Sequence, residues 1–470
     1  MINDFFKEKV KENFPFVPTS EQEATLTGIV DFLFLQKEES IFLLKGYAGT
    51  GKSSLLGALV KTMTDFKQKT VLLAPTGRAA KVFASYANHP AFTIHKKIYR
   101  QQKYSGELGN FGLMDNLHKD TLFIVDEASM ISNDGLDSSF FGTGRLLDDL
   151  IHYVYSAENC RILLIGDSAQ LPPVGEENSP ALQPDILIGY GLEVRQAMLS
   201  QIVRQAESSG ILYNATRIRN ALNKDKTGAY PKLKLSKFTD IVRISGEDLI
   251  DEISASYDKT GLESTMIITR SNKRCNIYNQ GIRNRILYKE EELSSGDMLM
   301  ITKNNYYWTE SIEGVDFLAN GEIVEVLRVR GEQEIYGFRF RDILVRSIDY
   351  DMELEIKILM DTLYSDAASL PRERSEELFL NVLEDYADIS TKAAKMKKMK
   401  TDPYYNAVQV KFAYAVTCHK AQGGEWDNVF LDMGYISEEH LGINFYRWLY
   451  TAITRASKKL YLVNLPDEFV

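Results

Sequence analysis

The chain has 470 residues, of which 44% are apolar and 26% charged, and its formal net charge is −10. This length favours two or more domains, each with its own hydrophobic core, and the composition argues against a disordered or membrane-spanning protein. The negative charge argues against nucleic-acid binding driven by the overall field of the protein, although local clusters of basic residues are still able to contact phosphates.

The N-terminal segment MINDFFKEKVKENF alternates apolar and charged residues at helical spacing. It lacks the unbroken apolar run and the cleavage site that a signal peptide needs. Cys160, Cys275 and Cys418 are widely separated and form no CxxC pair, which argues against a disulfide framework and a zinc site. We therefore expect a protein of the reducing cytoplasm.

Residues 40–200 alternate short apolar runs with helical patterns. The runs are SIFLLKG, TVLLAPT, TLFIVDE and CRILLIGD. Continuous apolar runs of this length are typical of parallel strands that are buried on both faces, with helices as the connections between them. Ligands bind such sheets beyond the carboxyl ends of the strands, where these runs place Gly46, Pro75, Asp126 and Gly166.

The segment GYAGTGKS, residues 46–53, follows the first of these runs and precedes a helical pattern. This pattern predicts a phosphate-binding loop, in which main-chain N–H groups and a helix N-terminus surround phosphates. Lys52 is then expected to contact the β- and γ-phosphate oxygens, and the Ser53 hydroxyl to ligate Mg²⁺. A glycine-rich turn without a ligand is the alternative. The predicted ATP contacts of this segment are Gly46, Ala48, Gly49, Thr50, Gly51, Lys52, Ser53 and Ser54.

Two adjacent carboxylates, Asp126 and Glu127, follow the run TLFIV. A carboxylate in this place is able to hold Mg²⁺, and its neighbour is able to orient and deprotonate an attacking water. Surface turns also begin with such pairs, but the upstream phosphate loop favours the catalytic interpretation.

The third motif, GDSAQLPPVG, follows the run RILLIG. Gln170 is suited to hydrogen-bonding a γ-phosphate or the attacking water, and Pro172 and Pro173 stiffen the segment that follows. A proline-rich loop without a role in binding would leave Gly166 and Asp167 unexplained.

A second α/β region is indicated by TMIITRSN near residues 265–272 and by VQVKFAYAVT and NVFLDM after residue 408. Between them, apolar and polar residues alternate in residues 297–405 as they do in strands, and a charged helical segment follows. This pattern predicts a β-rich insertion within the second α/β domain.

Taken in order, these motifs resemble those of superfamily 1 helicases, and most closely the RecD-like group of superfamily 1B that includes Dda. The resemblance runs from residue 18 to residue 457 and therefore covers nearly the whole chain. The motifs that carry it are Gln22 in PTSEQEATL, GYAGTGKS, LLAPTGRAA, FTIH, VDEAS, GDSAQLPPVG, LSQIVRQ, TCHKAQGGEW and LYTAITRA.

The resemblance implies an α/β fold with two RecA-like P-loop domains that contain parallel sheets, a β-hairpin pin and an SH3-like β-rich insertion. The implied boundaries are residues 1–95 and 121–198 for the first RecA-like domain, 96–120 for the pin, 199–296 and 406–470 for the second RecA-like domain, and 297–405 for the SH3-like subdomain with its helical segment.

The same resemblance assigns roles around ATP. Gln22 would recognise adenine and Glu425 the ribose, while Arg204 and Arg455 would reach the γ-phosphate as arginine fingers. The fixed donor fork of arginine suits the charge of a transferring phosphoryl group. For each arginine, a surface salt bridge is the alternative.

The resemblance also implies a single-strand track of hydroxyl, main-chain N–H and basic groups, which grip phosphates without reading bases. His95 is alternatively a buried, hydrogen-bonded histidine, and Thr269 and Asn272 are alternatively ordinary loop residues. The implied DNA contacts are Pro75, Thr76, Arg78, Thr93, His95, Thr269, Asn272, Thr417, His419 and Lys420.

The implied pin is a hairpin in residues 96–120 that turns at Ser105 and Gly106. Tyr99, Tyr104 and Phe111 are candidates for stacking on bases, with packing of the hairpin as the equal alternative.

These features predict an ATP- and Mg²⁺-dependent motor that moves 5′ to 3′ on single-stranded DNA and unwinds duplex at junctions. The interval from His95 to Asp126 holds a pin but not the domain found there in the 3′-to-5′ branch. We expect a monomeric cytoplasmic motor with repair or recombination proteins as partners and no membrane contact. The alternatives are a translocase with little unwinding, the motor subunit of a nuclease complex, and a small-molecule kinase, which would leave Arg204, Arg455 and TCHKAQGGEW unexplained.

Overall fold

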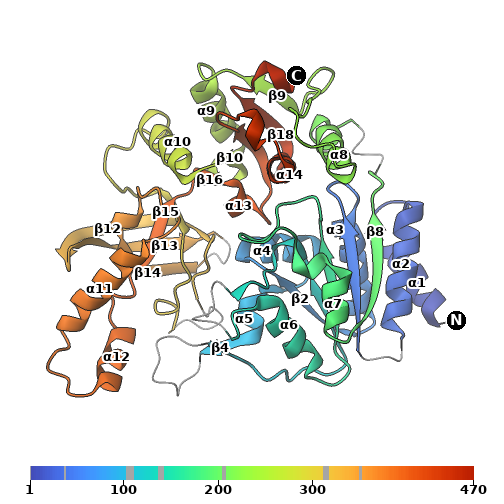
Figure 1. Cartoon of the computed structure of the whole chain (residues 1–470), viewed down its shortest axis with the longest axis horizontal. Helices are drawn as coiled ribbons and strands as arrows, with labels where there is room; N and C mark the ends of the chain where they lie inside the picture. Colours follow the sequence, from blue (N-terminus) through green and yellow to red (C-terminus); the bar gives the residue numbers. More distant parts are fainter. Residues whose placement is uncertain are drawn as a thin grey trace.

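The computed structural model describes residues 2–35, 39–101, 111–135, 142–203, 208–310, 317–348 and 352–470. These residues form a six-stranded sheet, a five-stranded sheet, a closed barrel and a two-stranded hairpin. Figure 1 shows the five-stranded sheet above the six-stranded one, with the barrel to one side of both. We call the two larger sheets with their helices the first and the second α/β unit.

The first unit is built on a parallel sheet in the order β3-β2-β6-β7-β1-β8. The interior strands β6 and β7 are buried along their whole length, as the continuous apolar runs predict. The strands are β1 Ser40–Gly46, β2 Lys69–Ala74, β3 Ala91–Thr93, β6 Thr121–Val125, β7 Arg161–Gly166 and β8 Glu193–Leu199.

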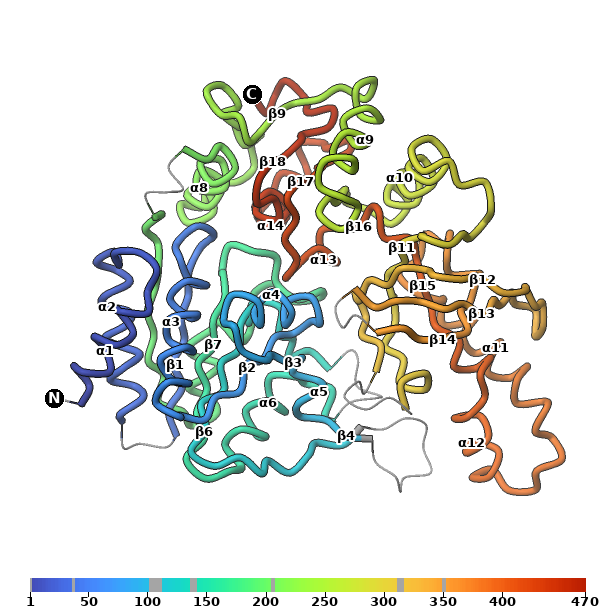
Figure 2. The backbone as a smooth tube through the Cα atoms, turned by 180° about the vertical axis from the view of Figure 1, so that it is seen from behind, coloured from blue at the N-terminus to red at the C-terminus, as the bar shows by residue number. Residues whose placement is uncertain are grey.

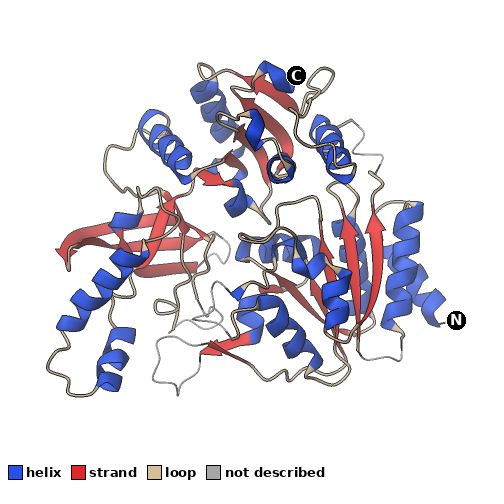
Figure 3. Ribbon diagram, in the orientation of Figure 1, coloured by secondary structure: helices blue, strands red, loops and turns tan. Residues whose placement is uncertain are grey.

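Helices cover both faces of this sheet (Figure 3). Phe42 and Leu44 of β1 pack in the core with α1 to α4, whereas Ile41 and Leu43 pack in the core with α5, α6 and α7. Successive strand residues therefore serve opposite faces, as the pleat requires. The helices are α1 Ile2–Asn13, α2 Ser20–Leu33, α3 Lys52–Asp65, α4 Gly77–Ala87, α5 Ile94–Ile98, α6 Leu146–Tyr155 and α7 Pro184–Gly189.

The second unit is built on a parallel sheet in the order β16-β10-β17-β18-β9. Its strands are β9 Ile241–Ile244, β10 Thr265–Thr269, β16 Ala415–Thr417, β17 Trp426–Asp432 and β18 Ala456–Val463. Its helices are α8 Gly210–Asn223, α9 Leu249–Thr260, α10 Asn272–Arg285, α13 Cys418–Ala421 and α14 Ile443–Ile453. The C-terminus lies beside β9, while the N-terminus lies at the far end of the first unit (Figure 2).

Strands β11 to β15 form a closed barrel. Its last strand corrects one prediction. We placed the run VQVKFAYAVT in the second α/β region, but Val408–Phe412 forms β15 of the barrel, and only Ala415–Thr417 joins the second sheet. Exposure alternates along β15, as expected for a strand with one solvated face. The remaining strands are β11 Met298–Ile301, β12 Ile323–Ile335, β13 Phe338–Ser347 and β14 Met352–Leu359.

The charged helical segment forms α11 Arg372–Glu384 and α12 Lys392–Lys400. Leu378, Val382 and Met399 of these helices pack against Phe338 and Phe340 of the barrel. None of the helices in the described ranges is long and apolar enough to cross a membrane.

The predicted hairpin is present as strands β4 Tyr99–Gln101 and β5 Phe111–Leu113, which pair antiparallel. Its turn at Ser105 and Gly106, Tyr104 and the side chain of Phe111 lie outside the described residues. The Tyr99 ring is buried, and its hydroxyl donates to Asp149 Oδ2 at 2.7 Å. For Tyr99 the packing alternative is therefore correct, and stacking on a base is wrong.

Candidate active site

The predicted phosphate loop lies between β1 and α3. Gly49 and Gly51 have φ of +76° and +78°, a conformation that side chains rarely adopt. Lys52 Nζ donates to the carbonyl oxygens of Gly46 at 2.7 Å and Tyr47 at 2.8 Å, so the ammonium group lies over the loop. Because α3 begins at Lys52, the loop also has the positive end of a helix dipole beside it.

Asp126 and Ser53, the predicted Mg²⁺ ligands, lie close together. The hydroxyl of Tyr86 donates to Asp126 Oδ2 at 2.5 Å and also lies within hydrogen-bonding reach of Ser53. Carboxylate and hydroxyl oxygens suit Mg²⁺, which usually keeps several waters and phosphate oxygens as its other ligands. The donor set at this point therefore fits the ion.

Glu127 follows Asp126 in a left-handed conformation, with φ of +51°. Burial raises the pKa of its carboxyl group to about 7, against the opposing positive charges of Arg455 and Lys52. A general base works best when its pKa lies near the operating pH. Glu127 is thus chemically suited to take a proton from water.

Gln170 and Asp167 follow β7 at the same edge of the sheet. Gln170 is buried, and its side-chain oxygen has no hydrogen-bond partner among the described residues. The buried Asp167 carboxylate accepts from the Ala169 N–H at 2.9 Å and from the Tyr450 hydroxyl at 2.6 Å. The unpaired oxygen makes Gln170 available to a ligand.

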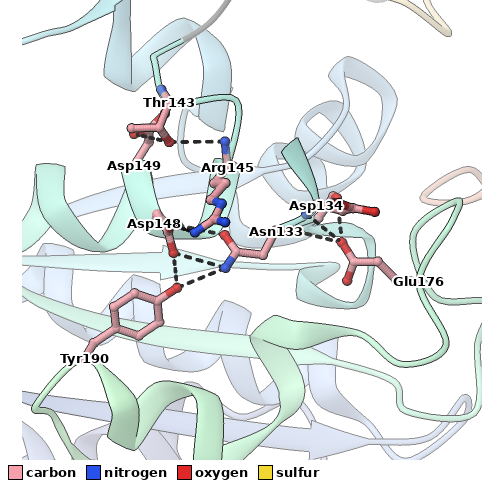
Figure 4. Close-up of polar contacts among 9 residues, drawn as sticks. Asn133, Asp134, Thr143, Arg145, Asp148, Asp149, Glu176 and Tyr190 are labelled. Carbon is pink, nitrogen blue, oxygen red and sulfur yellow. Dashed lines mark hydrogen bonds and ion pairs between the residues drawn. The ribbon is translucent and has the colours of Figure 1, made fainter. Parts of the chain in front are cut away.

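Figure 4 shows a polar network of the first unit that includes Asn133, Asp148 and Glu176. Glu176 Oε1, from the loop after Gln170, accepts from the N–H groups of Asn133 at 2.8 Å and Asp134 at 3.2 Å. Asn133 Nδ2 in turn donates to Asp148 Oδ1 at 3.0 Å. The segments that follow Glu127 and Gln170 are therefore fixed to one another.

Arg455 comes from the second unit and is 94% buried, with 6% of its surface exposed. It donates to the carbonyl oxygens of Thr451 at 3.1 Å and Gly424 at 3.0 Å, and has no carboxylate partner among the described residues. A surface salt bridge is thus the wrong interpretation for Arg455. Arg204 lies outside the described residues.

Gln22 lies beside the phosphate loop. Its Nε2 donates to the Thr50 carbonyl at 2.9 Å, and its Oε1 accepts from the Thr19 N–H at 2.9 Å as part of a capping box. The exposed Glu425 lies in the loop before β17, and its carbonyl oxygen accepts from Arg78 at 3.2 Å. The adenine and ribose roles of these two residues remain predictions.

A groove of about 690 Å³ separates the first unit from the barrel. Pro75, Thr76, Thr93 and the half-buried His95 line one wall. The opposite wall is formed by residues of the barrel and of the helical segment that carries α11 and α12, including Lys303, Asn304, Tyr306, Asn320, Lys400 and Tyr405. The structure therefore brings Pro75, Thr76, Thr93 and His95 to one surface, whereas Arg78, the fifth predicted track residue of the first unit, does not line this groove.

The predicted track residues of the second unit divide into two groups. Thr417 lies beside Thr269 in the parallel register of β16 and β10. Thr269 is fully buried, and its hydroxyl donates to the Ser271 carbonyl at 3.1 Å, which favours the loop interpretation. Lys420 instead donates to Asn320 in the wall of the groove, and burial lowers its pKa to about 8. His419 is exposed and Asn272 is half-exposed. Their contacts with DNA stay predictions.

Three residues of the site were given no role by the sequence. Tyr86 carries no motif signal, because one tyrosine in an amphipathic helix is ordinarily a packing residue. Asp167 was noted as part of the motif GDSAQLPPVG, and its place directly after β7, like that of Asp126 after β6, could have assigned it to the site. Tyr450 lies within the motif LYTAITRA, but only its contacts with the first unit reveal its place.

Comparison with known proteins gives two family matches. An AAA domain matches residues 21–234, and a UvrD-like helicase C-terminal domain matches residues 412–463. The uncharacterized protein R530 of Acanthamoeba polyphaga mimivirus is 25% identical, over 94% of this chain and 98% of its own length.

Two named helicases also match along most of the chain. The ATP-dependent RecD2 DNA helicase of Deinococcus radiodurans is 23% identical over 90% of the chain, which spans 46% of that protein. The ATP-dependent DNA helicase dda of Enterobacteria phage T4 is 23% identical, over 89% of the chain and 93% of its own length. The chain accordingly contains an AAA domain and a UvrD-like helicase C-terminal domain, and it is similar to two ATP-dependent DNA helicases over 89–90% of its length.

Proposed function

We propose that the chain is an ATP-dependent DNA helicase that moves 5′ to 3′ on single-stranded DNA and unwinds duplex. The observation that carries this proposal is that positive charges from both α/β units, Lys52 of the first and Arg455 of the second, act on the Glu127 carboxylate and lower its pKa. A site assembled from two units is able to convert hydrolysis at their interface into relative movement.

In this proposal the phosphate loop holds ATP, and Lys52 balances the charge of the β- and γ-phosphates. Ser53 and Asp126 would hold Mg²⁺, which would supply positive charge to the phosphates. Glu127 takes a proton from the attacking water, and Gln170 orients that water or the γ-phosphate. Arg204 and Arg455 stabilise the transferring phosphoryl group, while Gln22 binds adenine and Glu425 binds the ribose.

The single strand lies in the groove between the first unit and the barrel and continues onto the second unit. Its phosphates are held by Pro75, Thr76, Arg78, Thr93 and His95 of the first unit, and by Asn272, Thr417, His419 and Lys420 of the second. Closing and reopening of the ATP cleft changes the spacing of these two grips, which yields directional movement.

We propose the four subdomains expected above, with the barrel subdomain extended through Phe412 because β15 completes it. We further propose that the protein acts as a monomer in the cytoplasm on single strands and duplex junctions, with repair or recombination proteins as partners.

Two measurements test the function. ATP hydrolysis is measured with and without single-stranded DNA; we expect strong stimulation, and its absence would favour the kinase alternative. Strand separation is then compared on duplexes that differ only in carrying a 5′ or a 3′ tail. Preference for the 3′ tail would contradict the direction, and stimulation without unwinding of either substrate would favour the translocase or the nuclease-complex motor.

The pin is tested by replacing the segment SGELG, residues 105–109, with a short linker. We expect this variant to lose unwinding and to keep DNA-stimulated hydrolysis, because none of the predicted ATP-site residues belongs to this segment. Unwinding at the rate of the unaltered protein would contradict the role of the pin.

A further inference from the structure

The hydroxyl of Tyr450 joins three segments at the interface of the two α/β units. Tyr450 lies on α14 of the second unit and accepts a hydrogen bond from the Ala48 N–H at 2.9 Å. It donates to Asp167 Oδ2 at 2.6 Å. One side chain of the second unit therefore touches both the phosphate loop and the loop that leads to Gln170.

This hydroxyl is held firmly in place. Only 1% of the Tyr450 surface is exposed, and its ring belongs to the core of the second unit. Burial and the Asp167 carboxylate raise the pKa of Tyr450 well above its ordinary value, so the hydroxyl keeps its proton and serves as a donor. Because buried polar groups are costly when unpaired, displacement of Ala48 or Asp167 has to be matched by movement of Tyr450.

Residues near Tyr450 on α14 contact the same loop of the first unit. Thr451 Oγ1 accepts from the Leu171 N–H at 2.9 Å, and Arg447 donates to Asn178 Oδ1 at 3.0 Å. Arg455 lies just beyond the end of this helix. Movement of α14 along that loop consequently moves the arginine finger.

The tip of the phosphate loop also contacts α8 of the second unit. The Arg219 guanidinium lies 4.3 Å from the centre of the Tyr47 ring, and Asn223 Nδ2 donates to the Tyr47 hydroxyl at 3.0 Å. Tyr47 and Ala48, which precede Gly49 in the loop, thus face the second unit. A change in the loop on nucleotide binding is therefore transmitted directly to α8.

We propose that Tyr450 is a positioning residue that couples the state of the phosphate loop to the placement of α14 and Arg455. This inference rests on the proposed ATPase function and deepens it. Tyr450 transmits the position of the loop through its hydrogen bonds to Ala48 and Asp167, and takes no part in proton transfer.

The test is Tyr450→Phe, which keeps the ring and removes the hydroxyl. We expect the DNA-stimulated kcat to fall about tenfold, which corresponds to about 1.4 kcal/mol at the transition state, because the variant loses both hydrogen bonds of the hydroxyl, and we expect KM for ATP to change less than about twofold. The matched control is Tyr446→Phe on the same helix, which removes a buried hydroxyl that donates to the Ala229 carbonyl at 2.8 Å, remote from the phosphate loop. This control should retain kcat.

Two further variants separate coupling from simple packing. Asp167→Asn preserves the shape of the acceptor but weakens its hydrogen bond with Tyr450, and should lower kcat in the same direction. If Tyr450 acts through Arg455, adding Tyr450→Phe to Arg455→Ala lowers kcat by less than about twofold more, because residues that act as a unit are not additive.

Three results would overturn the inference: a Tyr450→Phe kcat within about twofold of the unaltered protein, equal losses in Tyr446→Phe and Tyr450→Phe, or additive losses with Arg455→Ala. An unaltered protein without DNA-stimulated hydrolysis would instead overturn the proposed function. The two failures are therefore distinguishable.

Discussion

The guanidinium group of Arg78 lies 4.3 Å from the ring centre of Trp426, so an arginine of the first α/β unit stacks on an aromatic side chain of the second. Arg78 also donates to the Glu425 carbonyl at 3.2 Å. Beside this contact, Gly423 has φ of +70°, and a Cβ atom there would lie 2.8 Å from Ala79 Cβ. Arg78 thus belongs to a tightly packed contact between the two units, and it is also a predicted phosphate contact.

Salt dependence separates these two roles of Arg78. If Arg78 neutralises a phosphate, Arg78→Ala should reduce the log–log salt slope of single-strand binding by about 0.7, the value for one phosphate. Trp426→Leu, which removes the stacking partner and no charge, should leave the slope intact. Equal slopes for the unaltered protein and the two variants would indicate that Arg78 serves only the contact between the units.

Removal of Lys52 or Glu127 should stop hydrolysis for different reasons. Lys52→Ala removes the cation over the loop and should abolish both turnover and tight ATP binding. Glu127→Gln should bind ATP with nearly unchanged affinity and lose turnover, because an amide does not accept the proton of the attacking water. Near-normal turnover of Glu127→Gln would rule out Glu127 as the base. Equilibrium nucleotide binding and steady-state hydrolysis provide the two measurements.

Arg455→Ala should leave nucleotide affinity almost intact and lower kcat by about 10³- to 10⁵-fold, as for other arginine fingers. In the structure Arg455 donates to the carbonyl oxygens of Gly424 and Thr451, so the proposed role at the γ-phosphate requires it to turn when ATP binds. Arg455→Lys keeps the charge but not the donor fork, and should restore only part of the rate. Parallel losses in affinity and rate would indicate a structural arginine.

Single-strand binding should weaken as pH rises from 7 to 9. The lowered pKa of Lys420, about 8, means that its charge is present below this pH and lost above it. Binding of a phosphate favours the charged form, so DNA binding near pH 8 should take up protons. Lys420→Arg keeps its charge over this range and should remove the corresponding part of the pH dependence. An identical pH profile for this variant would contradict the contact.

The attachment of the barrel to the second unit depends on a buried ion pair. Asp297, fully buried, accepts from Arg283 at 3.0 Å and from the Tyr414 hydroxyl at 2.8 Å. Asp297→Ala leaves Arg283 buried without its carboxylate and should cost about 3 to 5 kcal/mol of stability. The exposed pair Lys9–Glu12 provides the control, since Glu12→Ala should cost at most about 1 kcal/mol. Thermal unfolding of both variants checks the difference.

The sequence predicted the strands and the loop that are determined by residues close together in the chain. The runs around Phe42 and Ile124 predicted buried strands, and the order of glycines, Lys52 and Ser53 predicted the loop between β1 and α3. The run VQVKFAYAVT was misassigned, because Ala413 and Tyr414 separate two strands that pair in different sheets.

Contacts between the two units were beyond sequence reasoning. Tyr450 meets Ala48 across about 400 residues of chain, and no periodicity records such a pairing. Tyr99 illustrates a related difficulty, since an aromatic residue in a hairpin follows the same pattern whether it faces a base or packs against Asp149.

The closed barrel begins and ends at adjacent points. Its first and last strands pair with each other, Leu299 beside Phe412, and the Ala413 N–H donates to the Met298 carbonyl at 2.9 Å. The chain therefore leaves the second unit and returns to it at almost the same place, so the barrel could be gained, lost or exchanged during evolution without lengthening the gap that the parent sheet has to bridge.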